Sequence, residues 1–441
     1  MFSYYLKLAF KSIKRNPVLS LLMVTAIALG IGASMTTITV NYLMSADPIP
    51  HKSHQLFYVQ VDSWDPHNAF SDDSDDNNPP PNQLTWTDAT NLMAAKKAPK
   101  QTAMAKSGGI IEPQGLDSKP FEASIRLAFA DFFSMFDVPF QYGSGWPQSS
   151  DAKRDLVVVL SKNINDKVFG GENSVGKDFV MAGRTFRVVG VMDNWQPVPK
   201  FYDIQNGAFD EIEEVFMPFY LKEELELPNW GNTNCWKSPE GEGFKAFLRS
   251  ECINFQMWVE LPDLQAKADY LAFLNNYVAE QKSLGRFPRP LNNRLSDVTT
   301  WLDEQKVVEQ DARLMLWLSF MFLLVCLLNT IGLLLAKFTG KAAEIGLRRA
   351  VGATKAELFK QHIIEAGCIG LLGGIAGLGL AVLGLQGIKS LYGDYVNNLS
   401  SLDGTMVVVA LLLALVSSVL AGLYPTWRAC NIAPASQLKS Q

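Results

Sequence analysis

Four long stretches of the chain contain no Asp, Glu, Lys, Arg or His, and this pattern dominates the sequence. The stretches are 18–44, 314–336, 368–388 and 405–425. Each has the roughly 20 apolar residues that an α-helix needs to cross a bilayer. The pattern therefore predicts a membrane protein with four transmembrane helices. Buried helices of a large soluble protein are the alternative, but the matching charged flanks of the four stretches disfavour it.

Charges at the ends of these stretches predict the orientation of the chain. Residues 1–17 carry a net charge of +4, the segment 337–367 carries +3 and the tail 426–441 carries +2, whereas the connection 389–404 carries −1. The formal total of −5 leaves about −13 for residues 45–313. Because cytoplasmic loops are rich in Lys and Arg, we expect both termini and the 337–367 loop inside the cell and the long acidic segment outside it.

The first 17 residues predict an amphipathic helix that lies on the membrane surface. Its basic residues fall on one helical stripe, which would face anionic lipid headgroups. These residues are Lys7, Lys11, Lys14 and Arg15. A signal peptide cleaved near Ser45-Ala46 is the alternative. Its apolar region would normally span about 7–15 residues, and the stretch here is longer, so an uncleaved anchor is expected.

Residues 45–313 predict a large α+β domain inserted between the first and second transmembrane helices. Strands are expected at 56–61, 156–160, 179–192 and 253–261, and helices at 87–97, 161–169 and 264–282. The segment from about 125 to 219 has its own strands and helix, which predicts two lobes with this one inserted. Residues from about 302 to 313 contain no Gly or Pro, and this predicts a stalk helix that continues into the second transmembrane helix.

Several motifs in this domain suggest ligand chemistry but lack essential residues. The acidic run 71–81 resembles a calcium loop without the required Gly and without the final acid, so we expect a solvated, mobile loop. Gly171 to Lys177 fits G-x-x-x-x-G-K, but Asp178 stands where a nucleotide site needs Ser or Thr. The four histidines and scattered cysteines form no metal-ligand pattern. We therefore expect no metal site, no cofactor site and no catalytic site in this chain.

Cys235 and Cys252 are the cysteines that lie outside the predicted membrane region. An extracytoplasmic compartment is oxidising and favours disulfide formation. We expect a disulfide between these two residues, with two free thiols as the alternative.

A glycine-rich third transmembrane helix follows the basic loop. Gly370, Gly373, Gly374 and Gly377 form two overlapping G-x-x-x-G pairs. Such pairs let helix backbones approach closely in a membrane. The four charge-free stretches also predict a poor pathway for ions or polar solutes.

Four segments of the chain resemble the FtsX/MacB superfamily of ABC transporter permeases. They are NPVLSLLMVTAIALGIGASM at 16–35, VVLSKNINDKVFGGENSVGKDFVMAGRTFRVVGVM at 158–192, EIGLRRAVGATKAELF at 344–359 and YPTWRACNIAPASQL at 424–438. The third is the most specific. The resemblance implies a bacterial inner-membrane permease whose outer part looks like a MacB-like periplasmic core domain.

The resemblance also implies partners. Such permeases dimerise, with a second copy or a paralogue, and recruit two copies of a cytosolic ATPase through a coupling helix in the 337–367 loop. The positions that match this helix are Glu344, Ile345, Gly346, Leu347, Arg348, Arg349, Gly352 and Ala353. MacB carries its ATPase fused at the N-terminus, whereas this sequence has no room for one. ATP and Mg are therefore expected on a separate ATPase subunit, and the chain itself is not expected to be an enzyme.

Relatives of this architecture use ATP-driven dimer movement to act on the periplasmic side, which is called mechanotransmission. The resemblance implies efflux or export together with a periplasmic adaptor and an outer-membrane channel. Lipoprotein extraction is one alternative. Another is FtsX-like regulation of a periplasmic partner without transport, although the large outer domain favours export.

Overall fold

The computed structural model describes the chain except for residues 1, 72–77, 114–118, 309, 393–403 and 432–441. Most of the expected acidic loop 71–81, most of the connection 389–404 and the end of the tail 426–441 therefore lie outside the described residues. The chain divides into two compact units. One, here called the membrane unit, comprises Met1–Ser45 and Val308–Gln441, and the other, called the inserted domain, is Ala46–Val307.

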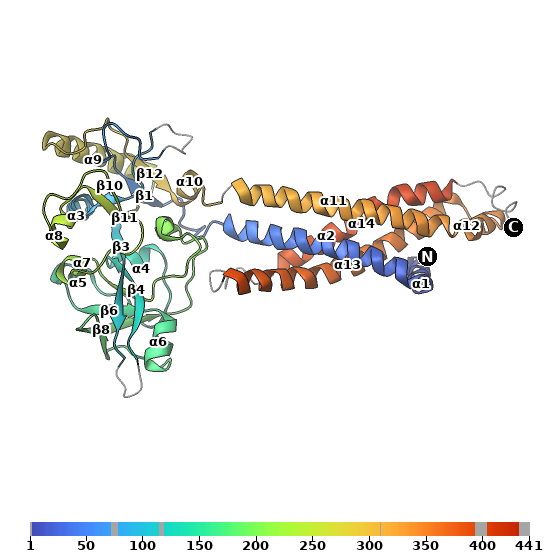
Figure 1. The fold of residues 1–441 in the computed structure, drawn as a ribbon, viewed down its shortest axis with the longest axis horizontal. Coiled ribbons are helices and arrows are strands. Elements are labelled where there is room, and N and C mark those ends of the chain that lie inside the picture. The colour runs from blue at the N-terminus through green and yellow to red at the C-terminus, as the bar shows by residue number, and fades with distance from the viewer. Residues whose placement is uncertain (1, 72–77, 114–118, 309, 393–403, 432–441) are drawn as a thin grey trace. The chain divides into compact units, whose positions relative to one another are not determined.

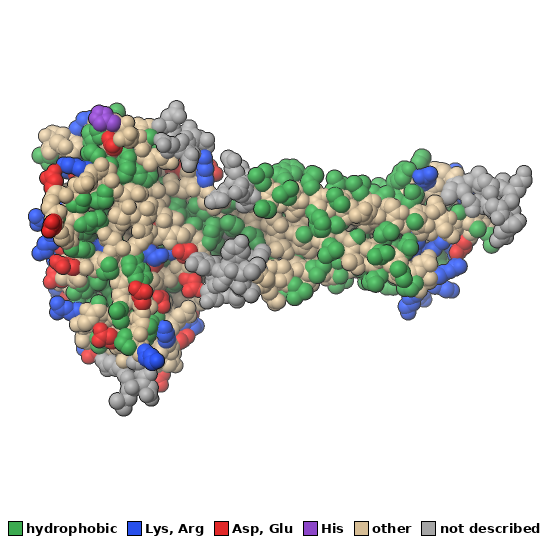
Figure 2. All heavy atoms as spheres, viewed as in Figure 1, with side chains coloured by type: hydrophobic (Ala, Val, Ile, Leu, Met, Phe, Trp, Pro, Cys, Tyr) green, Lys and Arg blue, Asp and Glu red, His purple; other side chains and the backbone are tan. Residues whose placement is uncertain are grey.

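The membrane unit is a bundle of long helices (Figure 1). Its helices are α1 Phe2–Arg15, α2 Pro17–Met44, α11 Gln310–Thr339, α12 Ala342–Ala350, α13 Lys355–Tyr392 and α14 Gly404–Cys430. Among the described residues, α2, α11, α13 and α14 are long and apolar enough to cross a membrane. Hydrophobic side chains cover most of their length, and Lys and Arg side chains gather at the end where α1 and α12 lie (Figure 2).

Two helix boundaries differ from the expectation. Helix α13 begins at Lys355, so the expected 337–367 loop consists of the end of α11, the short α12 and the first turns of α13. Helix α14 continues through Pro425 to Cys430 instead of ending at the proline. The first difference arises because the prediction used the absence of charge as its boundary, whereas polar helical turns can extend beyond a membrane span.

The inserted domain is built on a sheet of twelve strands among its described residues. The strands are β1 Leu56–Gln60, β2 Leu84–Thr85, β3 Lys100–Ile111, β4 Phe121–Ala128, β5 Phe140–Gly143, β6 Val157–Leu160, β7 Asp178–Met181, β8 Arg184–Met192, β9 Val215–Pro218, β10 Asn234–Cys235, β11 Cys252–Glu260 and β12 Arg294–Asp297. The helical elements are α3 Trp86–Ala95, α4 Asp131–Met135, α5 Gln148–Lys153, α6 Lys162–Phe169, the 3₁₀ helix η1 Phe201–Asn206, α7 Leu221–Glu224, α8 Phe244–Leu248, α9 Leu264–Ser283 and α10 Val298–Glu304. Apart from the stalk helix at about 302–313, the strands and helices expected in this domain from the sequence are present within a few residues.

The main path of the sheet runs in the order β12-β1-β11-β3-β4-β9-β6-β8-β5. Strands from 121–218 occupy one side of this path, and they join the other side through the antiparallel β3–β4 pair, whose register runs from Met104↔Ala128 to Ile111↔Phe121. Hydrophobic cores lie on both faces of the sheet. Because the sheet is continuous across the β3–β4 junction, the division into two lobes stays a prediction.

The expected continuous stalk helix is wrong. Helix α10 ends at Glu304, and α11 begins at Gln310. Lys306 adopts the left-handed conformation with φ 49°. Its N–H donates to the Asp303 carbonyl and the Val307 N–H donates to the Leu302 carbonyl, which together form a Schellman cap. The cap satisfies the last carbonyls of α10, so the helix ends without the glycine that would have marked its end in the sequence.

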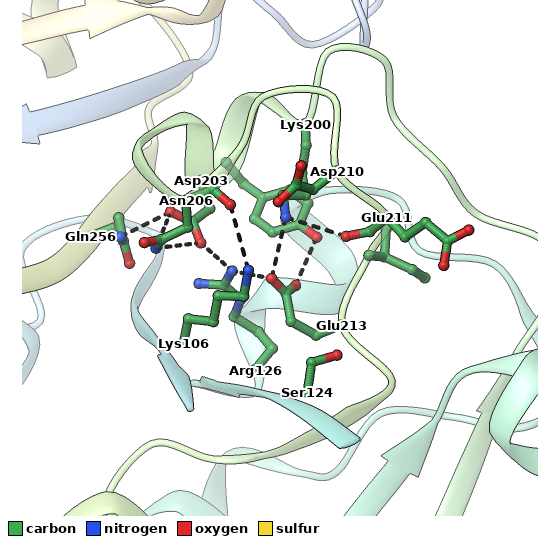
Figure 3. Close-up of polar contacts among 12 residues, drawn as sticks. Lys106, Ser124, Arg126, Lys200, Asp203, Asn206, Asp210, Glu211, Glu213 and Gln256 are labelled. Carbon is green, nitrogen blue, oxygen red and sulfur yellow. Dashed lines mark hydrogen bonds and ion pairs between the residues drawn. The ribbon is translucent and has the colours of Figure 1, made fainter. Parts of the chain in front are cut away.

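A network of buried charges holds the segment before β9 against the sheet (Figure 3). Strand β4 alternates, so Ile125 and Leu127 enter one core and Arg126 points to the opposite face. The Arg126 guanidinium donates to Asp203 and, at 2.5 Å, to Glu213, and all three side chains are at most 1% exposed.

Other groups complete this network. Lys200, also fully buried, lies 3.4 Å from the Glu213 carboxylate, and the Tyr202 hydroxyl donates to the same carboxylate at 3.0 Å. Burial alone would raise the pKa of Glu213, but Arg126 and Lys200 outweigh it and the pKa is lowered. Glu213 therefore stays ionised beside the Arg126 guanidinium inside the domain.

Replacing Arg126 tests how much this network stabilises the inserted domain. Arg126→Met leaves two buried carboxylates with one fewer cation, and breaking a buried ion pair costs about 3–5 kcal/mol of unfolding free energy. Eight of the ten tryptophans lie in this domain, so denaturant unfolding of the full chain can be followed by tryptophan fluorescence. The control is Arg187→Met, which removes an exposed pair with Asp178 and should cost about 1 kcal/mol or less. Equal losses in the two variants would contradict a stabilising role for the network.

Candidate functional site

Helix α12 connects α11 to α13 and contains most of the predicted coupling residues. It ends in a Schellman cap, in which the Gly352 N–H donates to the Arg349 carbonyl and the Ala353 N–H donates to the Arg348 carbonyl. Gly352 has a φ of 105°, which favours glycine at this position. The cap therefore fixes where α12 stops and α13 begins.

The two faces of α12 differ in exposure. Ala342, Ile345 and Gly346 are buried, and Ile345 belongs to the core of the helical bundle. On the opposite face, Leu347 is 61% exposed and Val351, just after the helix, is 81% exposed. Large apolar side chains at this spacing form an exposed stripe on one side of a helix.

The structure divides the predicted coupling residues between these faces. Ile345 and Gly346 are buried, so they support α12 from behind and do not form its free surface. Glu344 and Arg348 pair with each other at 2.7 Å, and Arg349 donates to the Cys430 carbonyl of α14 at 3.4 Å. Leu347, Gly352 and Ala353 remain at least partly exposed.

Sequence reasoning missed Val351, although its spacing of four residues from Leu347 was a usable signal. The positions implied by the resemblance include Leu347 but not Val351. The exposed apolar stripe is therefore defined by Leu347 and Val351, with Ala343 and Ala350 exposed beside them.

A buried charge cluster anchors the base of α12. Glu365 of α13 accepts from Lys337 of α11 at 2.8 Å, and Lys341 lies 3.5 Å from the same carboxylate. Lys337 also donates to the Ser20 hydroxyl of α2 at 3.1 Å, and the Ser12 hydroxyl of α1 donates to Glu365. The side chains of Lys337 and Glu365 are at most 1% exposed. The cluster therefore ties α1, α2, α11 and α13 together where the chain enters α12.

Two of the membrane-type helices extend beyond the charge-free stretches 314–336 and 368–388 and include charged residues. The candidate spans Leu314–Thr339 and Lys355–Gly387 include Lys337 and Glu365. The two charges neutralise each other as a close pair, and buried charges in membrane helices are stable only when paired in this way.

Glycines in α13 lie where neighbouring helices approach it most closely. A β-carbon on Gly373 would lie 2.7 Å from the Ile27 Cβ of α2, and one on Gly377 would lie 2.9 Å from the Ile31 Cβ. Gly370 and Gly374 face Ser418 and Ala414 of α14 in the same manner. The two predicted G-x-x-x-G pairs thus face two different helices of the same bundle.

Cys235 and Cys252 form a disulfide, as expected from the sequence. The two residues are directly paired across β10 and β11. The disulfide therefore fixes the short strand β10 to the central part of the sheet. The remaining cysteines, Cys326, Cys368 and Cys430, are free and buried in the membrane unit.

The region Gly171 to Lys177 forms a turn and not a phosphate-binding loop. Gly171 and Gly176 have positive φ, and Asp178 starts strand β7. Ala182 and Gly183 form the hairpin turn between β7 and β8, which divides the expected strand 179–192 in two. In the described part of the chain, no group of three His, Cys, Asp or Glu residues is arranged to hold a metal ion.

The inserted domain contains a cavity of about 290 Å³ near α3 and α5. Phe129, Tyr220 and the carboxyl groups of Asp131 and Asp151 contribute to its lining. Burial raises the pKa of Asp151 to about 6, although the Ala130 N–H and the Trp146 indole N–H donate to it and oppose this shift. Asp151 therefore titrates near neutral pH inside a folded domain.

Helix packing at Gly373 can be tested with a single methyl group. Gly373→Ala should overpack the contact with α2 and lower the stability of the membrane unit by about 1–3 kcal/mol. Gly379→Ala is the matched control, because no described atom lies within 4 Å of its β-carbon position, and it should gain up to about 1 kcal/mol from helix propensity. Both effects can be measured by heating the full chain with a thiol-reactive dye. The dye reacts with the three buried cysteines as the membrane unit unfolds, and the temperature at which it reacts reports stability. Equal shifts in the two variants would contradict close packing at Gly373.

Titration of Asp151 predicts a pH dependence of domain stability. Its pKa is higher in the folded state than in the unfolded chain, so the folded state binds more protons between about pH 4 and 6, and the unfolding free energy falls as pH rises through this window. The loss should amount to about 2–3 kcal/mol at most. Asp151→Asn should remove this pH dependence of the unfolding free energy. The difference in unfolding free energy between wild type and variant should therefore change between pH 4 and 6 and be constant above pH 7. Tryptophan fluorescence during denaturant unfolding measures it, and a difference independent of pH would contradict the raised pKa.

Comparison with known proteins gives matches along most of the chain. A family model described as MacB-like periplasmic core domain matches residues 20–263, and one described as FtsX-like permease C-terminal matches residues 316–434. The macrolide export ATP-binding/permease protein MacB of Escherichia coli O6:K15:H31 is 23% identical over 99% of this chain and 60% of its own length. The pyoverdine export ATP-binding/permease protein PvdT of Pseudomonas entomophila is 23% identical over 76% of this chain and 45% of its own length. The chain thus spans about half the length of these relatives.

Solved structures similar to the chain match somewhat more than half of it. The periplasmic region of MacB from Actinobacillus actinomycetemcomitans matches 59% of this chain and 96% of its own chain, with 16% identity and a TM-score of 0.36. The extracellular domain of the ABC-type transporter YknZ from Gram-positive bacteria matches 55% and 100%, with 13% identity and a TM-score of 0.33. The family assignment therefore rests on the sequence matches, which cover more than half of the chain. The described part of the chain has four membrane-type helices, with a mixed α/β domain inserted in the sequence between the first and the second. The chain belongs to the FtsX/MacB-like permeases that carry a MacB-like periplasmic core domain.

Proposed function

We propose that this chain is the permease subunit of an ABC transporter that couples ATP hydrolysis on a separate cytosolic ATPase to export or efflux on the periplasmic side. The observation that carries the proposal is the exposed apolar stripe of α12, Leu347 and Val351, on a helix whose other face is fixed in the bundle. Apolar side chains that are this exposed at the end of a membrane bundle suit a protein partner.

The anchoring of α12 supports a mechanical role. A docked partner that moves α12 also moves α11 and α13, because Lys337, Lys341 and Glu365 join the helices at the point where α12 starts. Movement of α2 follows through the Lys337–Ser20 hydrogen bond and the close contact at Gly373. This arrangement favours mechanotransmission, in which the helices transmit movement and substrate does not pass between them.

The broken stalk changes the route proposed from the sequence. Movement would reach the inserted domain through the two chain connections, at Ser45-Ala46 and through the non-helical residues 305–308, and not along one rigid helix. The exporters MacB and PvdT among the relatives support a role in export. The substrate of this chain is not assigned by that similarity.

The proposal places ATP and Mg on the partner ATPase, with no catalytic group and no cofactor on this chain. It places the protein in the bacterial inner membrane with both termini in the cytoplasm and the inserted domain in the periplasm, as the charge distribution favours. A second permease copy or a paralogue would complete a dimer. A periplasmic adaptor and an outer-membrane channel would complete a MacB-like export system.

The test is a single charge on the exposed stripe. Leu347→Asp places a carboxylate where the proposal buries a leucine, so ATPase activity that copurifies with the tagged full chain from its native host should fall about tenfold or more. Leu347→Met keeps an apolar side chain and should retain the activity. Both variants should keep the wild-type thermal stability, because Leu347 is largely exposed.

Two results would overturn the proposal. Full ATPase activity with Leu347→Asp would exclude the α12 stripe as the docking surface. Wild-type chain that copurifies with no ATP-hydrolysing protein would exclude an ABC transporter.

A further inference from the structure

A small cavity lies between α1, α12 and the first turns of α13 in the membrane unit. Its volume is about 160 Å³, which is below the roughly 300–1,000 Å³ of sites for drug-sized molecules but enough for several waters or one compact polar group. Lys11, Arg15, Lys341 and Arg348 contribute basic side chains to its lining, and Glu344 contributes the one carboxylate among its lining residues.

The positive charge around this cavity is only partly neutralised. Glu344 already pairs with Arg15 at 3.2 Å and with Arg348 at 2.7 Å. Lys341 interacts with Glu365 at 3.5 Å, but that carboxylate is shared with Lys337. Lys11 makes no ion pair or hydrogen bond with any residue that the structure describes. The cavity lining therefore carries more positively charged than negatively charged side chains.

A buried and unsatisfied side chain also lines the cavity. His362 is 3% exposed, and neither ring nitrogen forms a hydrogen bond within the described part of the chain. Its Nδ1 faces the Glu365 carboxylate at 3.6 Å, which is an ion-pair distance when the ring is protonated. Nε2 is therefore the ring nitrogen that has no partner within the described part of the chain. Buried polar groups without a partner are rare in native structures and point to an unseen water or ligand.

The position of the cavity along the chain indicates where such a ligand comes from. Arg15 lies two residues before the start of the first candidate span at Pro17, and Lys341 lies two residues after the end of the second at Thr339. Arg15 and Lys341 thus lie at the level at which the first two candidate spans end and lipid headgroups begin. Phosphate is the compact anionic group found at that level.

We propose that this cavity is a phosphate-group site, in which Lys11, Arg15, Lys341 and Arg348 surround the anion and His362 donates one N–H to it. Such a ligand would join α1 to α12 and so stabilise the position of α12. The phosphate could be supplied by an anionic phospholipid headgroup or by free phosphate, since the chemistry of recognition is the same. The inference does not depend on the proposed transport function, because binding can be measured without ATP or an ATPase.

The test uses two pairs of lysine and arginine positions on the same helix. Lys11→Gln with Arg15→Gln removes two charges from the cavity, whereas Lys7→Gln with Lys14→Gln removes two charges from exposed positions of α1 that do not line it. Native mass spectrometry of the full chain, extracted from nanodiscs of phosphatidylcholine and phosphatidylglycerol, measures the phosphatidylglycerol that stays bound. The cavity variant should bind it about tenfold more weakly than wild type, and the surface variant should match wild type.

A second arm identifies the source of the phosphate. Titration of inorganic phosphate onto the full chain in phosphatidylcholine nanodiscs, followed by thermal stability, reports binding of the free ion. Stabilisation that is lost in the cavity variant, without selective retention of phosphatidylglycerol, assigns the site to free phosphate. Selective retention of phosphatidylglycerol assigns it to lipid.

Three results would overturn the proposal. Equal losses in the cavity and surface variants would show diffuse attraction of α1 to anionic membranes, and unchanged binding in both would exclude the site. If the double cavity variant does not fold, Lys11→Gln alone is compared with Lys14→Gln alone, because Lys11 has no described partner to lose. Equal binding by these two single variants would likewise exclude the site.

Discussion

The membrane unit depends on one ion pair, between Lys337 of α11 and Glu365 of α13. Burying either charge alone at the end of a helical bundle would be costly, and removal of one partner of such a pair typically costs about 3–5 kcal/mol. The hydroxyl groups of Ser12 and Ser20 and the ammonium of Lys341 complete the contacts of this pair, so four helices and the start of α12 meet there. The glycines of α13 pack closely against α2 and α14, so α2 is held in the bundle both by the charge cluster and by close packing, and α14 is held to α13 by packing.

The features predicted from the sequence are those that depend on local composition or spacing. The membrane helices were predictable because charged residues are absent over about 20 residues, and the β7–β8 hairpin was predictable because Ala182-Gly183 separates two alternating strands. The cap of α12 was predictable from Gly352. The glycine pairs of α13 were predictable from their spacing, although the identity of the facing helices was not.

Features that depend on residues far apart in sequence were not predictable. Arg126 meets Asp203 and Glu213 across 77 and 87 residues, and nothing in the three local segments indicates the contact. Strand β3 was missed because Ala, Lys, Ser and Gly fill most of it and its β-branched residues are confined to Thr102, Ile110 and Ile111. Its pairing with β4 and β11 decides its conformation, and Gly108 lies directly against the Trp230 indole, where a side chain would not fit. The site on α12 was only half predicted, because burial of Ile345 and exposure of Val351 follow from how the helix packs.

The end of α10 at Lys306 has a consequence for how the protein unfolds. Helix formation is cooperative along an unbroken ladder of hydrogen bonds, and fraying spreads along the same ladder. The hydrogen bonds of α10 stop at the Schellman cap, and a new set begins in α11. Unfolding of the last turns of α10 therefore does not continue along hydrogen bonds into the membrane helix α11. Helices α10 and α11 are therefore separate hydrogen-bonded ladders, and residues 305–308, which belong to neither helix, are where a protease acting on the native protein would find non-helical backbone.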